Sequence, residues 1–187
     1  MSIYYPSSSC SGGTVPDYYC TPCLTYEYGR IRHIALISTS YIDTLLGNPT
    51  SATVWQTGIT NGSIFVLYKT QGSYDGGSTS EIAGFGDAAT TNGNTTHTLT
   101  FKDPNYAENC DFYNELRASA DYTLAYVTSD SVHFSEEVVT FSPKNPVQDD
   151  INSIVTWEVL CKWTNNDSPC AYAKPTGNFF DTCYIHS

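Results

Sequence analysis

The sequence has few positive charges and no long hydrophobic segment. Its 187 residues include 8 Lys and Arg against 19 Asp and Glu, which gives a formal net charge of -11. A chain this acidic repels the phosphates of nucleic acid and of anionic membranes. No run approaches the roughly 20 apolar residues that span a bilayer. We therefore expect that the protein neither binds DNA nor inserts into a membrane. An acidic surface is nevertheless compatible with DNA that slides along it without binding.

Export signals and a complete metal-binding motif are also lacking. Residues 1–6 show neither the basic nor the apolar part of a signal peptide, so secretion is not expected. Cys20 and Cys23 have the spacing by which two thiolates bind one zinc ion, and Cys10, His33 or a C-terminal thiol are the candidates that would complete the site. A zinc ribbon normally has a second close pair, whereas residues 171–182 separate Cys170 from Cys183. Plain thiols or a disulfide and a structural zinc both stay open, and no other cofactor is expected.

No catalytic signature is present either. The histidines are scattered and none lies in a nucleophile elbow or a metalloprotease helix, so structural roles are expected for His33, His97, His133 and His186. Glu136 and Glu137 are neighbours on a predicted strand, so they point to opposite faces and cannot share a substrate. Gly84-Phe85-Gly86 lacks the strand, helix and lysine of a phosphate loop. The sequence predicts a protein that is not an enzyme.

The composition fits one globular domain with an apolar core. Hydrophobic residues make up 40% and charged residues 14% of the chain, so a core can form while the surface carries little charge. The predicted organisation is an extended N-terminal arm over residues 1–29, a folded domain over 30–163, and a cysteine-containing C-terminal tail over 164–187.

Alternating apolar residues predict strands through most of the domain. In Thr96–Phe101, for example, His97, Leu99 and Phe101 share one face. Similar patterns predict strands at 31–37, 63–69, 122–128, 132–141 and 153–163. Cap-forming side chains at Asp103 and Asn105, followed by Phe112 and Leu116 one turn apart, predict one helix over 104–119. The fold class is therefore mainly β, a β-sandwich with one flanking helix.

A long polar segment interrupts this pattern. Residues 70–96 are rich in Gly, Ser, Thr and Asn, too polar for a core and long for a plain connection. They include Ser73, Tyr74, Asp75 and Phe85. We predict a long loop that has a function of its own.

The order of elements resembles the tail-tube-like subunits of bacteriophages. The likeness lies in a Gly-Phe-Gly loop leading into residues 96–101, an Asp-Pro-Asn-Tyr helix start at 103–106, and three following strands. Residues 20–23 with 27–32, and residues 143–163, look like structural ring proteins of crAss-like phages of gut bacteria. The resemblance covers roughly residues 20–163.

This resemblance implies a β-sandwich with a side helix whose rings stack into a conduit. It implies that the long loop, with Ser73, Tyr74, Asp75 and Phe85, reaches a neighbouring subunit or ring. The expected partners are copies of the chain in a six- or twelve-fold ring and neighbouring ring proteins of the tail or neck, with DNA only as passing cargo. The expected location is the virion, made in the cytoplasm of a host bacterium. The family transfers no catalytic residue.

Two alternatives remain. A head decoration protein shares the sparse charge and extended ends. A secreted carbohydrate-binding β-sandwich is the alternative from another class, suggested by the 15 tyrosines, which serve sugar-binding faces and wet protein interfaces equally well.

Overall fold

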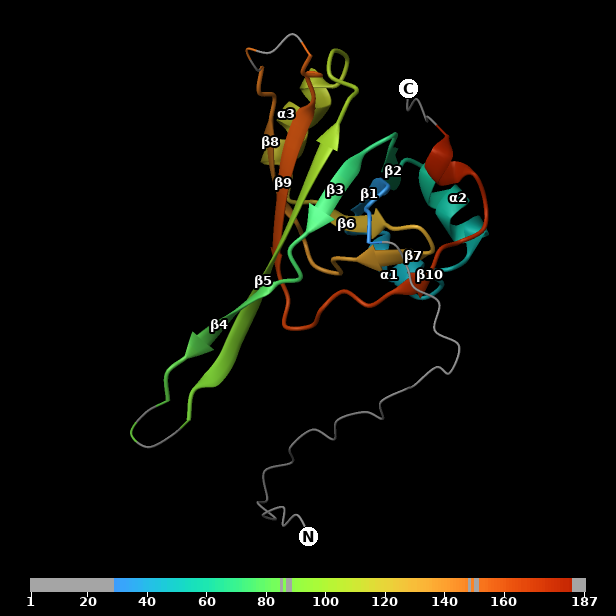
Figure 1. The fold of residues 1–187 in the computed structure, drawn as a ribbon. Helices are drawn as coiled ribbons and strands as arrows, with labels where there is room; N and C mark the ends of the chain where they lie inside the picture. Colours follow the sequence, from blue (N-terminus) through green and yellow to red (C-terminus); the bar gives the residue numbers. More distant parts are fainter. Residues whose placement is uncertain (1–28, 85, 87–88, 148, 150–151, 183–187) are drawn as a thin grey trace.

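Two antiparallel sheets packed face to face form the body of the molecule (Figure 1). The computed structural model describes residues 29–84, 86, 89–147, 149 and 152–182. The predicted mainly-β class, a β-sandwich with a flanking helix, is confirmed. The predicted N-terminal arm lies outside the described residues except for Gly29.

The first sheet has the strand order β10-β7-β6-β1-β2. Its strands are β1 (His33–Ser38), β2 (Ile64–Leu67), β6 (Tyr122–Val127), β7 (Ser131–Phe134) and β10 (Tyr172–Ala173). On the central β1, Ile34 and Leu36 contribute to one hydrophobic cluster, whereas Ala35 and Ile37 contribute to another. Because side chains alternate along a strand, both faces of this sheet are covered by other parts of the chain.

The second sheet has the order β3-β5-β9-β8, and β4 pairs with β5 beside this path. Its strands are β3 (Gln71–Tyr74), β4 (Ser78–Ile82), β5 (Thr91–Asp103), β8 (Thr140–Lys144) and β9 (Trp157–Thr164). On β9 the predicted alternation holds, because Trp157, Val159, Cys161 and Trp163 are all buried. The predicted strand extends too far toward the N-terminus, since residues 153–156 are not strand and Ile154 is 81% exposed.

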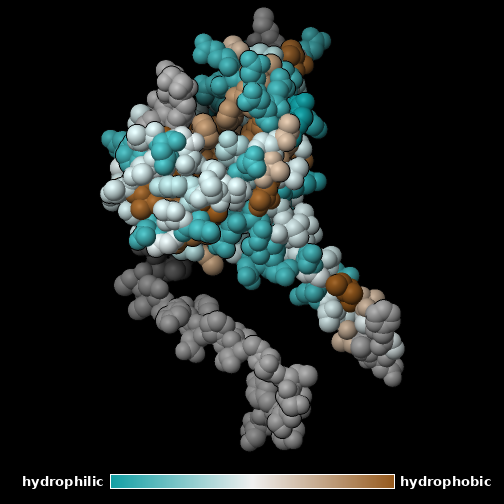
Figure 2. Space-filling model, turned by 180° about the vertical axis from the view of Figure 1, so that it is seen from behind, coloured by the Kyte–Doolittle hydropathy of each residue, from teal (hydrophilic) through white to brown (hydrophobic). Residues whose placement is uncertain are grey.

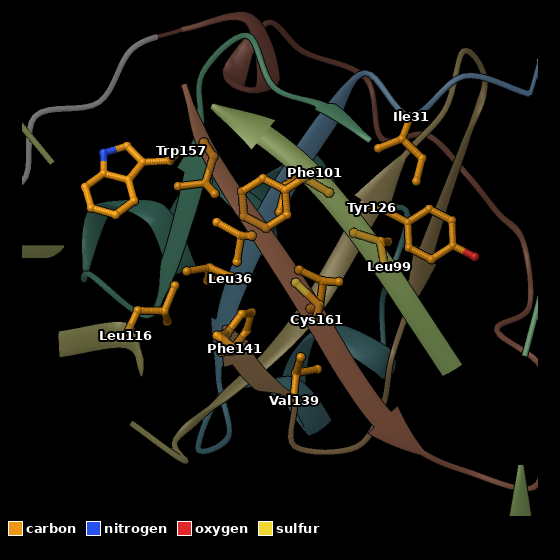
Figure 3. Packing of buried hydrophobic residues seen from close by; sticks show 14 of the residues in the cluster. Ile31, Leu36, Leu99, Phe101, Leu116, Tyr126, Val139, Phe141, Trp157 and Cys161 are labelled. Atoms are coloured by element: carbon orange, nitrogen blue, oxygen red, sulfur yellow. The ribbon is translucent and has the colours of Figure 1, made fainter. Parts of the chain in front are cut away.

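The main core lies between the two sheets (Figure 3). Leu36 from the first sheet meets Phe101, Phe141 and Cys161 from the second. Helix α3 (Cys110–Ala118) closes one side with Tyr113 and Leu116, and the Arg117 guanidinium donates to the Pro143 carbonyl at 2.7 Å.

The prediction of a single helix over 104–119 is wrong in number and in start. Helix α3 begins at Cys110, because the Asp103 carboxylate accepts hydrogen bonds from the amide and side chain of Asn105 and forms a turn instead. Helices α1 (Ile42–Leu46) and α2 (Ala52–Thr60) were not predicted. Glycine and β-branched residues weaken the helical signal of α2. Gly58 is required there by packing, since a Cβ would lie 2.5 Å from the Ile64 side chain.

The single strand predicted over 132–141 is also wrong. β7 and β8 belong to different sheets, and residues 135–139 cross between them. Glu136 has a positive φ of 59° in this crossing, and both Glu136 and Glu137 are exposed. The two carboxylates therefore lie in a turn and not on opposite faces of a strand.

The predicted C-terminal tail is part of the fold over most of its described length. β10 adds to the first sheet, and the short helix η1 (Phe179–Asp181) buries Phe179 and Phe180. Both rings pack on Trp55 of α2, with centroid distances of 5.9 and 5.0 Å. Periodicity could not show this, because the two rings belong to a very short element.

We expect Phe180→Ala to reduce the free energy of unfolding by about 3–5 kcal/mol, because it empties a fully buried site. Urea denaturation measures the loss. Ile154→Ala is the control, since this side chain is 81% exposed and its truncation should change stability by less than about 0.5 kcal/mol. Equal effects of the two changes would contradict the packing of the C-terminal segment.

We also expect stability to fall as the pH drops below about 6.5. Burial lowers the pKa of His33 below its ordinary value, although Asp181 at 3.4 Å opposes the shift. The unfolded chain then takes up a proton at a pH at which the folded chain does not, so acid favours unfolding. His33→Gln should flatten this dependence and Asp181→Asn should steepen it, as measured by urea denaturation between about pH 5 and 8.

Candidate assembly interface

The polar segment predicted as a loop over 70–96 is mostly strand. It contains β3, β4 and the first part of β5. The prediction failed because neither face of β4 is buried, so the segment lacks the apolar alternation that marks a strand. Its many threonines nevertheless favour extended structure.

Strand β5 extends well beyond the body of its sheet. Its second part, from Thr96 to Asp103, pairs with β9, and Leu99 to Lys102 pair with β3 on the other side. Its first part pairs with β4, from Thr91 opposite Ile82 to Thr96 opposite Ser78. The chain therefore forms a two-stranded ribbon that leaves the sandwich (Figure 1).

We call residues 78–84 and 89–95 the projecting hairpin. Figure 2 shows it as a separate extension at the lower right of the space-filling view. Its strand β4 has five residues, which corresponds to a length of roughly 17 Å. Every residue of β4 is exposed. In the described part of the chain, no strand pairs with the outer edge of β4.

Polar contacts hold the hairpin together, and its surface carries little charge. The hydroxyls of Thr79 and Thr95 share a hydrogen bond at 2.8 Å, and the Ser80 hydroxyl donates to the Asn94 carbonyl at 3.1 Å. Glu81 is the one charged residue in the two ranges. Ile82 is 55% exposed and is the large hydrophobic side chain of the hairpin. An isolated two-stranded ribbon is marginally stable in water, so this one depends on its base.

The base of the hairpin is the short segment of residues 75–77 that connects β3 to β4. The Asp75 carboxylate accepts hydrogen bonds from the amides of Gly77 and Thr98, at 2.9 and 3.0 Å. Gly76 and Gly77 both have φ of +86°, a conformation that residues with a side chain rarely adopt. Gly77 also lies against His97, since a Cβ there would be 2.7 Å from its Nδ1 atom.

Stacked aromatic rings lie next to this connecting segment. Tyr74 stacks on His97 and on Trp163, with centroid distances of 5.9 and 5.8 Å, and contacts Tyr126 at 5.4 Å. His97 is fully buried and stacks on Trp163 at 5.3 Å. These rings come from both sheets, so the base of the hairpin is fixed to the core.

Hydrogen bonds set the tautomer of His97. Its Nε2 lies 3.0 Å from the Asn165 carbonyl, and its Nδ1 lies 2.6 Å from the Tyr74 hydroxyl. Because a carbonyl only accepts, the neutral ring donates from Nε2, and Nδ1 accepts from Tyr74. The expected structural role of His97 fits these contacts.

Tyr74 and Asp75 keep their charge states over a wide pH range. Burial, with a smaller contribution from Asp75, raises the pKa of Tyr74 to about 12. Burial also acts to raise the pKa of Asp75, but the amide hydrogen bonds from Gly77 and Thr98 outweigh it, and the pKa falls below its ordinary value. Tyr74 is therefore a neutral donor and Asp75 an anionic acceptor at neutral pH.

The residues predicted for contact between subunits occupy different positions. Ser73 is exposed on β3, whereas Tyr74 is half-buried in the ring stack and Asp75 closes the turn at the base. Phe85 lies outside the described residues. Sequence reasoning missed Ile82, and its place as a lone large apolar residue in a polar segment was the available signal.

The proposed metal ligands Cys10, Cys20 and Cys23 lie outside the described residues, as does His186. Cys110 and Cys170 are exposed free thiols, and burial raises the pKa of Cys161. Within the described part of the chain, His, Cys, Asp and Glu form no group of three or more that could hold a metal ion. A search of the same residues found no helix long and apolar enough to cross a membrane.

Comparisons with protein-family models, with curated proteins and with solved structures found no match. The function is therefore inferred from the hairpin, its base and the surface around it.

We expect Gly77→Ala to destabilise the protein more than Gly76→Ala. Both changes strain a positive φ, at about 1–2 kcal/mol, but only the Gly77 variant also pushes a methyl group into His97 and Thr95. Nothing lies within 4 Å of a Cβ at Gly76, so it is the matched control. Thermal unfolding of the two variants checks this, and equal melting temperatures would contradict the close contact at Gly77.

Proposed function

We propose that this protein is a non-enzymatic structural subunit of a virus particle. In this proposal, copies of the chain form a ring in the tail or neck of a phage, and the projecting hairpin joins neighbouring copies. The observation that carries the proposal is the hairpin itself, which leaves the sandwich with both faces of β4 and the Ile82 side chain exposed.

The energetics of the hairpin support an intermolecular role. A ribbon of two strands gains little stability alone, whereas covering one apolar side chain such as Ile82 contributes about 1.5–3 kcal/mol. Open strand edges add backbone hydrogen bonds when a partner lies beside them. Contact with a neighbour therefore satisfies groups that the described part of the chain leaves open.

The charge distribution supports association between identical chains. Each copy carries a formal net charge of -11, so two copies repel each other unless the surfaces that meet are poor in charge. The described hairpin carries one charged side chain, Glu81.

The position of the ring in a tail or neck rests on the resemblance of residues 20–163 to phage ring proteins.

The aromatic residues in the described part of the chain do not favour carbohydrate binding. All three tryptophans are buried, and every described tyrosine is buried or half-buried. Sugar-binding faces use exposed rings as flat platforms. In the described residues, the aromatic side chains instead stabilise the core and the base of the hairpin.

The proposal predicts that the wild-type protein forms closed oligomers and that a variant with a shortened hairpin is monomeric. The shortened variant replaces residues 80–94 with Asn-Gly, which links Thr79 to Thr95 by a two-residue turn. Light scattering gives the mass, and negative-stain electron microscopy gives the symmetry. A monomeric wild-type protein would overturn the proposal.

A point variant tests the same contact more gently. We expect Ile82→Asp to weaken assembly at least tenfold, since about 1.4 kcal/mol corresponds to a factor of ten. Val147→Asp is the matched control, because Val147 is also an exposed apolar residue, 74% accessible, outside the hairpin.

Antibody labelling of virions distinguishes a tail or neck ring from a head decoration protein, for which the antibody would label the capsid.

A further inference from the structure

A groove lies between helix α2 and the C-terminal segment, by which we mean residues 176–182. It has a volume of about 520 Å³ and is open to solvent. Its walls include Thr53, Gln56 and Thr57 from α2, and Thr176, Asn178 and Phe179 from the opposite side. None of the described residues that line it is charged.

The walls of this groove are held in place by the core. Phe179 stacks on Trp55 with an interplanar angle of 17°, and the Trp55 indole donates to the Pro49 carbonyl at 2.9 Å. The Thr182 hydroxyl donates to the Asn178 carbonyl at 2.8 Å, which links the two ends of η1. These contacts fix the positions of the groove walls, which reduces the conformational entropy lost when a ligand binds.

The chemistry of the groove matches that of the projecting hairpin. The groove offers hydroxyl and amide side chains beside the ring of Phe179, and the hairpin offers hydroxyls, amides and the exposed side chain of Ile82. Hydroxyl and amide groups both donate and accept hydrogen bonds, so they suit open strand edges. On a chain with a net charge of -11, a contact between two surfaces with almost no charge also avoids like-charge repulsion.

A hairpin cannot occupy the groove of its own chain. In Figure 1, α2 and η1 lie at the right of the molecule, whereas β4 lies at the lower left, with both sheets between them. The occupant must therefore come from another copy. A contact between two different patches of identical chains is heterologous, and it closes into a ring when the rotation between copies allows.

We propose that the projecting hairpin of one copy inserts into the α2 groove of the next copy, with Ile82 against the exposed lining residues of α2. This inference rests on the proposed function, in which the hairpin joins neighbouring copies. It adds the receiving surface and makes the ring directional, with each copy giving a hairpin on one side and receiving one on the other.

A mixing experiment tests the directional contact. The first variant has the shortened hairpin and an intact groove. The second has an intact hairpin and the changes Thr53→Glu and Thr57→Glu, which place negative charge on exposed positions of the groove wall. Thr44→Glu on α1 is the control for added charge, because Thr44 is exposed and lies outside the groove.

We expect each of the two variants alone to assemble at least tenfold more weakly than the wild-type protein and the Thr44→Glu control. Mixed together, they should form a one-to-one heterodimer and nothing larger, because the pair retains one hairpin and one groove that fit. Mass photometry or light scattering measures the product.

The possible outcomes separate the two proposals. If the wild-type protein is a monomer, the proposed function fails. If the shortened variant is monomeric while the groove variant still forms rings, the hairpin joins copies but this groove is not the receiver. If both variants are monomeric and their mixture gives no heterodimer, the directional contact is overturned.

Discussion

The pairing of β5 with β9 is the constraint on which the rest of the structure depends. It runs without a break from Thr96 opposite Thr164 to Asp103 opposite Trp157. It places Leu99, Phe101, Val159 and Cys161 in the core between the sheets. Because β5 continues past the end of this pairing, the same strand that organises the core also forms one side of the projecting hairpin. Core and hairpin are thus parts of one continuous element.

The base of the hairpin shows how a polar extension is attached to an apolar body. Tyr74 and His97 stack within the core cluster, while Asp75 and the two glycines after it redirect the chain. The turn needs glycine for its backbone angles, and at Gly77 it also needs the space above His97. Orientation of the hairpin relative to the sandwich therefore comes from packing at its base, although the hairpin itself is exposed.

Much of the fold was predictable from sequence, because apolar alternation marks strands whose one face is buried. This holds for β9, where the alternate residues Trp157, Val159, Cys161 and Trp163 are buried. It fails for β4, which buries neither face, and for α2, where a tightly packed Gly58 weakens the helical signal. It also fails for Phe179 and Phe180, whose burial against Trp55 depends on a contact between distant segments. The candidate interface was predictable as a region, since residues 70–96 were singled out, but not as a hairpin, and Ile82 was not identified.

The direction of β5 has a mechanical consequence. Hydrogen bonds between antiparallel strands lie across the strand axis, and β5 runs from the hairpin straight into its pairing with β9 (Figure 1). A force that pulls the hairpin along its own axis acts in shear on that whole row of bonds at once, and does not peel them apart singly. Tension applied at the tip is therefore transmitted into the centre of the sandwich, where it meets the most resistance.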